Sequence, residues 1–116
     1  MKRVADKEVF YEHLLQERSA AWLVATGVSF VSCREHCCWG MALHVEGRVL
    51  IPEQLRHALS RRFGEAERYS GYFLFLDARQ DFFIWRALPT ACSVEMSLED
   101  IRHAQLTLAG FEHLFG

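Results

Sequence analysis

The sequence has little proline, no long apolar run and no excess of charge of one sign. It holds 2 prolines and 7 glycines in 116 residues, so it has no linker rich in either, and we predict a single domain over residues 1–116. No stretch approaches the roughly 20 apolar residues of a membrane-spanning helix. The formal net charge of −2 argues against a broad basic surface for nucleic acid or anionic lipid.

The chain opens without the apolar segment of a secretory signal. Its first residues read MKRVADKE, so we expect a cytoplasmic protein. The 4 cysteines are then expected to be reduced thiols rather than disulfides. The hydrophobic fraction of 51% is ordinary for a globular domain and argues against disorder.

No motif points to catalysis, and no glycine-rich phosphate loop is present. Asp77 and Asp81 resemble paired carboxylates, but they lie in an expected turn, where aspartate is favoured for backbone reasons. Arg56, Arg61 and Arg62 form a small basic patch among glutamates, which favours a solvated helix face. We therefore expect no enzyme, no catalytic residue and no cofactor.

One dense cluster of soft ligands is present, made of Cys33, His36, Cys37, Cys38 and His44. Zinc sites usually draw four ligands from two separated pairs, and a second pair is missing, so we predict no metal site. The favoured interpretation is a set of strand thiols that behave as small hydrophobes. Two alternatives stay open: a ligand or metal site on the Cys33–His44 hairpin, and a thiol nucleophile such as Cys33 with His44.

Two aromatic-rich runs flanking a short polar turn give the clearest structural signal. Residues 71–76 and 82–89 lie on either side of residues 77–81, which is typical of a β-hairpin. Neither run alternates cleanly, so both faces of the hairpin are apolar, unlike a half-solvated antiparallel pair. One set should pack on the last helix, and the other should meet another helix, a second subunit or a ligand: Tyr72, Leu74, Leu76, Phe82 and Ile84 form one set, and Phe73, Phe75, Phe83 and Trp85 the other.

The remaining elements follow from apolar spacing and from start and stop signals. The last helix is the clearest, because its apolar residues recur at three-and-four spacing from Ile101 to Phe115. The order predicts an α+β fold with a mainly antiparallel sheet. The expected elements are a helix over 7–19, a strand or helix extension over 22–26, strands over 28–32, 37–45 and 48–51, a helix over 52–63, the hairpin, and a last helix capped near Ser97.

This order resembles the class I type III secretion chaperones of Gram-negative bacteria, which have an α-β-β-β-α-β-β-α fold. The hairpin from Phe73 to Leu88, ending Arg86-Ala87-Leu88-Pro89 before a capped amphipathic helix, is similar to the closing unit of that family. The strands from Phe30 to Ile51 that lead into a helix at Pro52 resemble its central part. The resemblance covers most of the chain from about Val28 onward.

The resemblance implies a cytosolic homodimer that holds an extended segment of a secreted effector or a secretion-apparatus protein by β-augmentation. A heterodimer is the alternative assembly. The residues expected to contact the partner are Phe10, Leu14, Trp39, Met41 and Leu43. The residues expected at the dimer contact are Leu55, Leu59 and Phe63.

Overall fold

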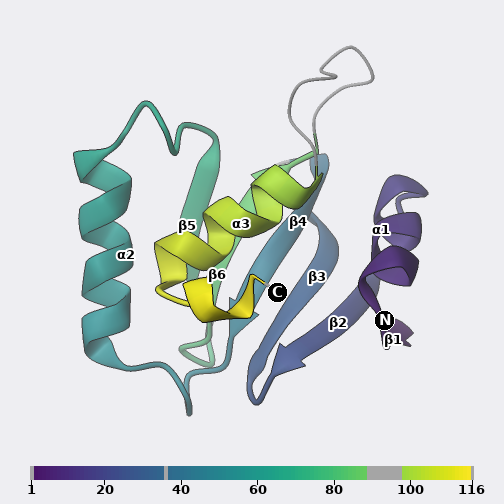
Figure 1. The fold of residues 1–116 in the computed structure, drawn as a ribbon, viewed down its shortest axis with the longest axis horizontal. Helices are drawn as coiled ribbons and strands as arrows, with labels where there is room; N and C mark the ends of the chain where they lie inside the picture. Colours follow the sequence, from purple (N-terminus) through teal and green to yellow (C-terminus); the bar gives the residue numbers. More distant parts are fainter. Residues whose placement is uncertain (1, 36, 89–97, 116) are drawn as a thin grey trace.

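The computed structural model describes residues 2–35, 37–88 and 98–115, which form one mixed sheet with three α-helices. Figure 1 shows the arrangement. Among these residues, no helix is both long and apolar enough to cross a bilayer. The strands are β1 (Lys2–Val4), β2 (Ala20–Ala25), β3 (Val28–Glu35), β4 (Cys38–Val45), β5 (Tyr72–Leu76) and β6 (Phe82–Ala87). The helices are α1 (Lys7–Leu15), α2 (Pro52–Gly64) and α3 (Leu98–Ala109), with a final 3₁₀ turn, η1 (Glu112–Leu114).

The sheet has six strands in the order β1-β2-β3-β4-β6-β5. Only β1 and β2 run parallel, and every other neighbouring pair is antiparallel. The predicted α+β class with a mainly antiparallel sheet is therefore confirmed. The α-β-β-β-α-β-β-α order is confirmed as well, with β2, β3 and β4 as the three strands between the first two helices and β1 as an additional short strand before α1.

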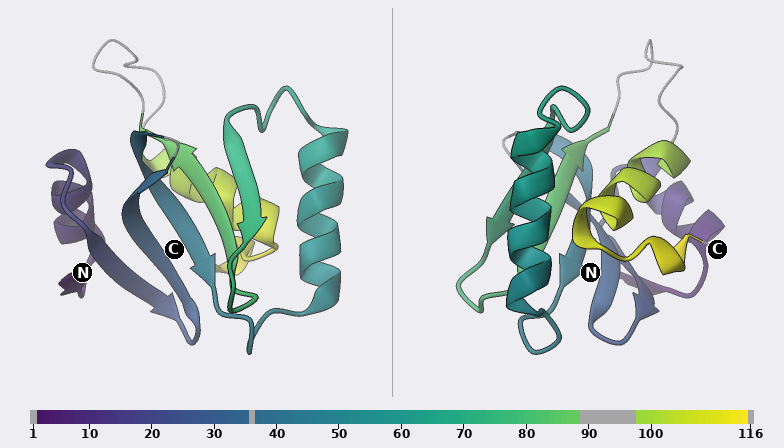
Figure 2. Two further views of the ribbon diagram at one scale, coloured as in Figure 1. Left: turned by 180° about the vertical axis from the view of Figure 1, so that it is seen from behind. Right: turned by 60° about the vertical axis from the view of Figure 1, so that its left-hand side comes forward.

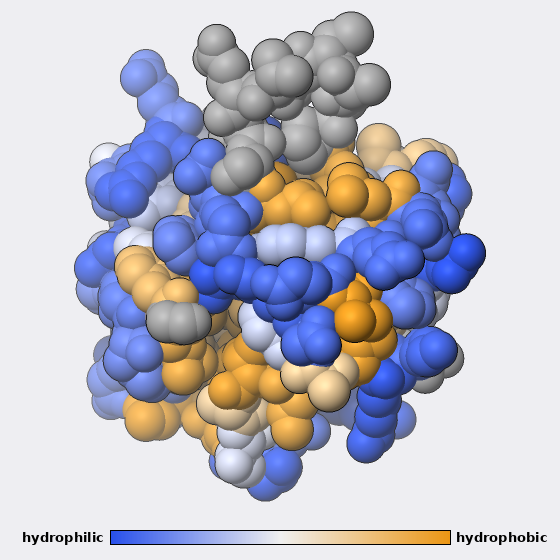
Figure 3. Space-filling view, turned by 45° about the vertical axis from the view of Figure 1, so that its right-hand side comes forward, coloured by the Kyte–Doolittle hydropathy of each residue, from blue (hydrophilic) through white to orange (hydrophobic). Residues whose placement is uncertain are grey.

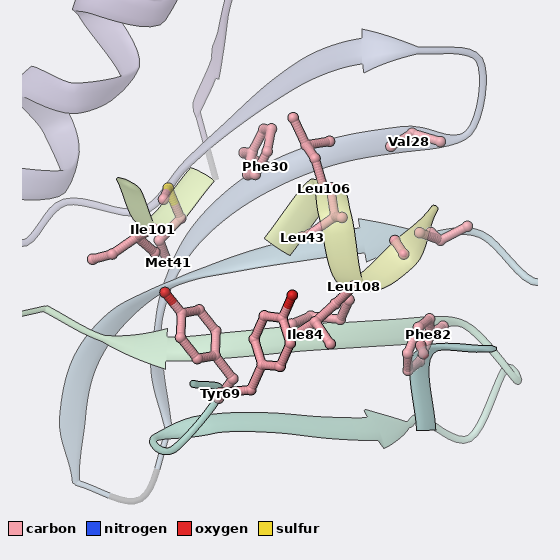
Figure 4. Close-up of a cluster of buried hydrophobic side chains, with 14 of the residues drawn as sticks. Val28, Phe30, Met41, Leu43, Tyr69, Phe82, Ile84, Ile101, Leu106 and Leu108 are labelled. Atoms are coloured by element: carbon pink, nitrogen blue, oxygen red, sulfur yellow. The ribbon is translucent and has the colours of Figure 1, made fainter. Parts of the chain in front are cut away.

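Two helices cover one face of the sheet, and the third stands at its edge. Figures 1 and 2 show α1 and α3 on the same side of the strands, while α2 runs beside β5. The core lies between the sheet and α3, as Figure 4 shows for Phe30, Leu43, Ile84 and Leu106, all fully buried. Figure 3 shows the surface on the side of α1 and α3. A hydrophilic band crosses it, with hydrophobic residues above and below the band.

Two predicted helices are longer than the observed ones, because the backbone turns away at specific residues. The first was expected to reach Ser19, but it ends at Leu15, and Glu17 adopts a positive φ of 54° that no helix continues. The last was expected to reach Phe115, but Gly110, with φ 79°, ends it at Ala109. Asp6 caps α1 as expected, since its carboxylate accepts from the Val9 amide at 2.9 Å. The expected cap Ser97 lies outside the described residues.

The predicted strand over residues 48–51 is wrong. Residues 48 and 49 form a turn in which the amides of Val49 and Leu50 donate to the carbonyl of Glu46, at 3.0 and 3.1 Å. The segment 22–26, predicted as either a strand or a helix extension, belongs to a strand, β2, that runs from Ala20 to Ala25. Pro52 opens α2 as its missing N–H predicts.

Candidate protein-binding surface

The hairpin formed by β5 and β6 divides its aromatic residues between the two faces of the sheet, as the sequence predicts. Tyr72, Phe82 and Ile84 point into the core under α3 and are at most 3% exposed. The other set points to the opposite side, where no described helix lies in front of the strands (Figure 2, left). We call this side the helix-free face. Strand alternation assigns to it Ala21 and Leu23 of β2, Ser29, Val31 and Cys33 of β3, Gly40, Ala42 and His44 of β4, Phe83 and Trp85 of β6, and Phe73 and Phe75 of β5.

Strand register arranges the helix-free face in rows that cross the sheet. In one row, Phe75 stacks on Phe83 with ring centres 5.1 Å apart, and Phe83 stacks on His44 at 4.6 Å. In the next row, Phe73 lies 5.9 Å from Trp85. Trp85 is only 1% exposed because its ring lies against the backbone of Gly40, whereas Phe73 is 47% exposed. The face is thus ordered by ring stacking and keeps large apolar groups in contact with solvent.

A hollow of about 710 Å³ lies on the helix-free face toward β1 and β2. Leu23, Val31 and Phe83 contribute apolar walls, and Leu23 is 68% exposed. Arg3 and Arg48 also line it. Arg48 is paired with Glu46 at 2.6 Å, while Arg3 has no ion pair within residues 2–35, 37–88 and 98–115. The hollow therefore combines apolar walls with an available cation.

A contact between His44 and Asp81 fixes the His44 side chain at the middle of the helix-free face. His44 Nε2 lies 2.9 Å from Asp81 Oδ2, and the Gly47 amide donates to Asp81 Oδ1 at 2.7 Å. The amide hydrogen bond, followed by the contact with His44, holds the pKa of Asp81 below its usual range. Asp77 accepts from the amides of Arg79 and Asp81. Both aspartates therefore stabilise turns and loops, as the turn interpretation predicts.

The two edges of the sheet differ in chemistry. The β1 edge is only three residues long and carries Lys2 and Arg3, features that discourage pairing with another strand. The β5 edge, with the sequence YFLFL, has no charge and no proline. Its Tyr72 carbonyl accepts from Arg62 Nε at 3.0 Å and so points away from β6. By alternation, the main-chain groups of Leu74 and Leu76 also face outward, and no described strand pairs with them.

Helix α2 also exposes apolar residues at helical spacing. Ile51 is 52% exposed, Leu59 40% and Phe63 77%, while Leu55 is half-buried. Among its residues only Ala58 is buried. The basic residues of this helix are engaged locally: Arg56 with Glu53, Arg61 with His57 and Glu112, and Arg62 with the Tyr72 carbonyl. That Leu55, Leu59 and Phe63 form a dimer contact stays a prediction.

The residues expected to contact a partner lie mostly in the core. Phe10, Leu14, Met41 and Leu43 are fully buried among the chain's own residues, and Trp39 is half-buried against that core. Their role in binding stays a prediction, and it requires α1 or α3 to move away from the sheet. Leu23 was not singled out by the sequence, whereas Phe73 belongs to the hairpin set expected to meet another helix, a second subunit or a ligand. The apolar faces of the hairpin were the signal that pointed to this surface.

The structure describes three of the cysteines, Cys33, Cys37 and Cys38, and these three do not form a constellation suited to chemistry. Cys33 is half-buried, and burial, with a smaller contribution from Glu35, raises the pKa of its thiol to about 11. Cys33 is paired with Gly40 and His44 with Ser29, so the two residues lie four positions apart along the strands, roughly 13 Å. Cys37 and Cys38 are exposed, and His36 lies outside the described residues. The described residues hold no group of three side chains able to bind a metal ion.

Comparison with known proteins gives one match. The sequence model of the HrpV-like family matches residues 1–113. That family is a regulatory one associated with type III secretion. No curated protein and no solved structure matches the chain.

Proposed function

The chain belongs to the HrpV-like family, and we propose that it is a non-enzymatic adaptor of type III secretion that holds an extended segment of a secreted protein or of a secretion-apparatus protein. The observation that carries this proposal is the β5 edge at Leu74 and Leu76, which no described strand occupies, although α2 runs beside it and Arg62 binds the Tyr72 carbonyl (Figure 1). The sequence of β5 lacks the charges and proline that normally block strand addition. Two of its side chains, Phe73 and Leu76, are 47% and 42% exposed.

The chemistry of that edge suits an extended peptide. Main-chain groups of Leu74 and Leu76 face outward and can pair with a partner strand, which supplies affinity with little dependence on sequence. Phe73 and Phe75, on the adjacent helix-free face, offer contacts to alternate side chains of that strand. In this proposal the adaptor keeps a segment bound and soluble without a covalent step, which is the mechanism that the sequence resemblance to class I secretion chaperones implies.

The working unit in this proposal is a homodimer joined through α2. Leu59 and Phe63 are exposed at i, i+4 spacing, with Leu55 one turn before them, which is the pattern of a helix that packs on another element. Light scattering should give twice the chain mass, and Leu59→Glu with Phe63→Glu should give the monomer. His57→Glu, on the opposite side of α2, adds a like charge and should leave the dimer intact. A wild-type monomer at micromolar concentration contradicts the dimer.

Site-specific photo-crosslinking tests the partner. A photoreactive phenylalanine analogue replaces Phe73 in the native host under conditions that induce secretion, and the matched control places it at Leu15, which is 67% exposed at the end of α1. We expect adducts with a secreted or apparatus protein from position 73 and none from position 15. With the crosslinker at Leu76 instead, Phe73→Lys should reduce the adduct, because a lysine at the edge opposes strand addition. Equal labelling from positions 73 and 15 contradicts the proposal.

A further inference from the structure

We propose that the helix-free face binds a second element, an amphipathic α-helix of a partner protein, which lies over the hollow beside β2 and places an acidic residue near Arg3. This site goes beyond the proposed function, which uses the edge of β5. The site crosses the interior strands β6, β4, β3 and β2 on the helix-free face, from Phe75 of β5 to Leu23 of β2.

The interior strands offer a partner almost no main-chain hydrogen bonds. Each of β3, β4 and β6 is paired on both sides within the sheet, and β2 is paired with β3 on one side and with β1 over Ala20–Trp22 on the other. An extended segment crossing this face would bury its own N–H and C=O groups against apolar side chains, and each unpaired group costs free energy. A helix satisfies its backbone internally and presents only side chains. The face therefore selects a helix, whereas the β5 edge selects an extended strand.

The dimensions of the face agree with a helix of ordinary length. From Phe75 on β5 to Leu23 on β2, the row passes through Phe83, His44 and Ser29. Five strands at a spacing of about 4.8 Å cover roughly 19 Å. A helix rises about 1.5 Å per residue, so about 13 residues span the row. The hollow between Leu23, Val31 and Phe83 gives one large apolar side chain of that helix a place to insert.

Charge sets the preferred chemistry at one end. Glu46 already neutralises Arg48 at 2.6 Å, and the His44–Asp81 contact occupies the polar groups at the centre. Arg3 lines the hollow from β1 and has no carboxylate partner in the part of the chain that the structure describes. A partner carboxylate at this end gains a charge-assisted contact, and a lysine there is repelled. The partner is therefore a helix with an apolar stripe and an acidic end.

Fluorescence anisotropy with synthetic peptides tests the inference. The probe is a labelled 16-residue peptide with capped ends, a leucine stripe at i, i+4, i+7 and i+11, and two glutamates at one end. The controls are a scrambled peptide of the same composition, a peptide with a central proline, and a peptide with lysines in place of the glutamates. We expect the probe to bind saturably. The scrambled and proline peptides should bind at least tenfold more weakly than the probe.

Protein variants locate the site. Leu23→Asp should weaken probe binding at least tenfold, because it replaces an apolar wall of the hollow by a carboxylate that the bound helix would remove from water. Arg3→Glu should weaken it about two- to fivefold, as for an exposed ion pair, and should improve binding of the lysine peptide. The matched control is Leu15→Asp, an equally exposed leucine on α1. Circular dichroism checks that each variant is folded.

Three outcomes overturn the inference. Equal binding of the probe and the scrambled peptide shows only non-specific adhesion. Stronger binding of the proline peptide shows that the occupant is extended. Dissociation of a wild-type oligomer by Leu23→Asp shows that a second copy of the chain covers the face. The crosslinking at Leu76, which lies off the helix-free face, tests the β5 edge with a different residue and a different readout, so either proposal can fail while the other stands.

Discussion

Gln105 of α3 donates its side-chain amide to the main-chain carbonyl of Met41 in β4, at 2.8 Å. The same nitrogen donates to the carbonyl of Ile84 in β6, at 2.9 Å. Gln105 is fully buried, so both bonds form away from solvent. A single polar side chain therefore anchors α3 over the junction of two strands.

Replacing this glutamine should destabilise the fold. Gln105→Met keeps an unbranched side chain of similar length but removes the donor, which leaves two buried carbonyls without that partner. The expected loss in the free energy of unfolding is about 1–3 kcal/mol. Urea denaturation followed by tryptophan fluorescence measures it. The control Gln16→Met changes an exposed glutamine and should shift the midpoint little. Equal midpoints for the two variants contradict the anchoring role.

Acid should weaken the contact between α1 and α3. Glu99 accepts from Arg102 at 2.8 Å and from the Tyr11 hydroxyl at 2.6 Å, and it pairs with Lys7 at 3.2 Å. The hydrogen bond from Arg102, with smaller contributions from Tyr11 and Lys7, lowers the pKa of Glu99 to about 2. Because the folded pKa is below the unfolded one, the stabilisation is complete above the ordinary glutamate pKa and is lost as the pH falls toward 2.

The measurement compares melting temperatures at pH 7 and pH 3. Wild-type protein should lose more on acidification than Glu99→Gln, which lacks the ionisable group at both values. Glu67→Gln, an exposed glutamate on the loop after α2, should instead lose as much as wild type. The difference between wild type and Glu99→Gln is small, since Glu99 is partly exposed and screened. An identical acid shift in all three proteins contradicts the prediction.

Gly40, in the middle of the sheet on β4, should not tolerate a side chain. A Cβ at Gly40 would lie 2.4 Å from the carbonyl oxygen of Arg86 and 2.7 Å from the ring of Trp85. Gly40→Ala therefore pushes β4 away from β6, with an expected cost of about 1–3 kcal/mol. The matched control is Gly64→Ala, because nothing lies within 4 Å of its Cβ and it is the last residue of α2. Thermal melts should show a lower midpoint for Gly40→Ala and an equal or higher one for Gly64→Ala.

The thiols should differ in reactivity, with Cys33 the slowest of the three that the structure describes. Its pKa is raised to about 11, so almost none of it is thiolate at pH 7. Cys37 and Cys38 are exposed and should react with iodoacetamide before Cys33 does. Timed alkylation with peptide mass spectrometry measures the order. Rapid labelling of Cys33 at pH 7 contradicts the structure and revives the thiol-enzyme alternative.

Local signals in the sequence predicted the elements whose stabilising contacts are also local. The hairpin of β5 and β6 followed from two apolar runs around the turn over 77–81, and α2 followed from Pro52 and an apolar stripe. The predictions from the sequence were wrong or incomplete where a contact between residues distant in the chain determines the local structure. Residues 48–51 look extended, yet Val49 turns back to lie over Gly27, where a Cβ would come within 2.7 Å of it. Strand β1 was not predicted, because Lys2–Val4 is short and mostly charged and forms a strand only by pairing with β2.

The sequence by itself determined the α+β class and the hairpin with apolar residues on both faces, because both follow from the period of apolar residues along a few adjacent turns or strands. Only the tertiary structure decided which apolar residues become core and which remain a surface. Phe10 and Met41 are as hydrophobic as Leu23 and Phe73, yet the first two are fully buried and the last two are 68% and 47% exposed. The physical reason is that α1 and α3 can cover only one face of the sheet, and the choice of face depends on contacts such as those of Gln105 with β4 and β6, which join residues far apart in the chain.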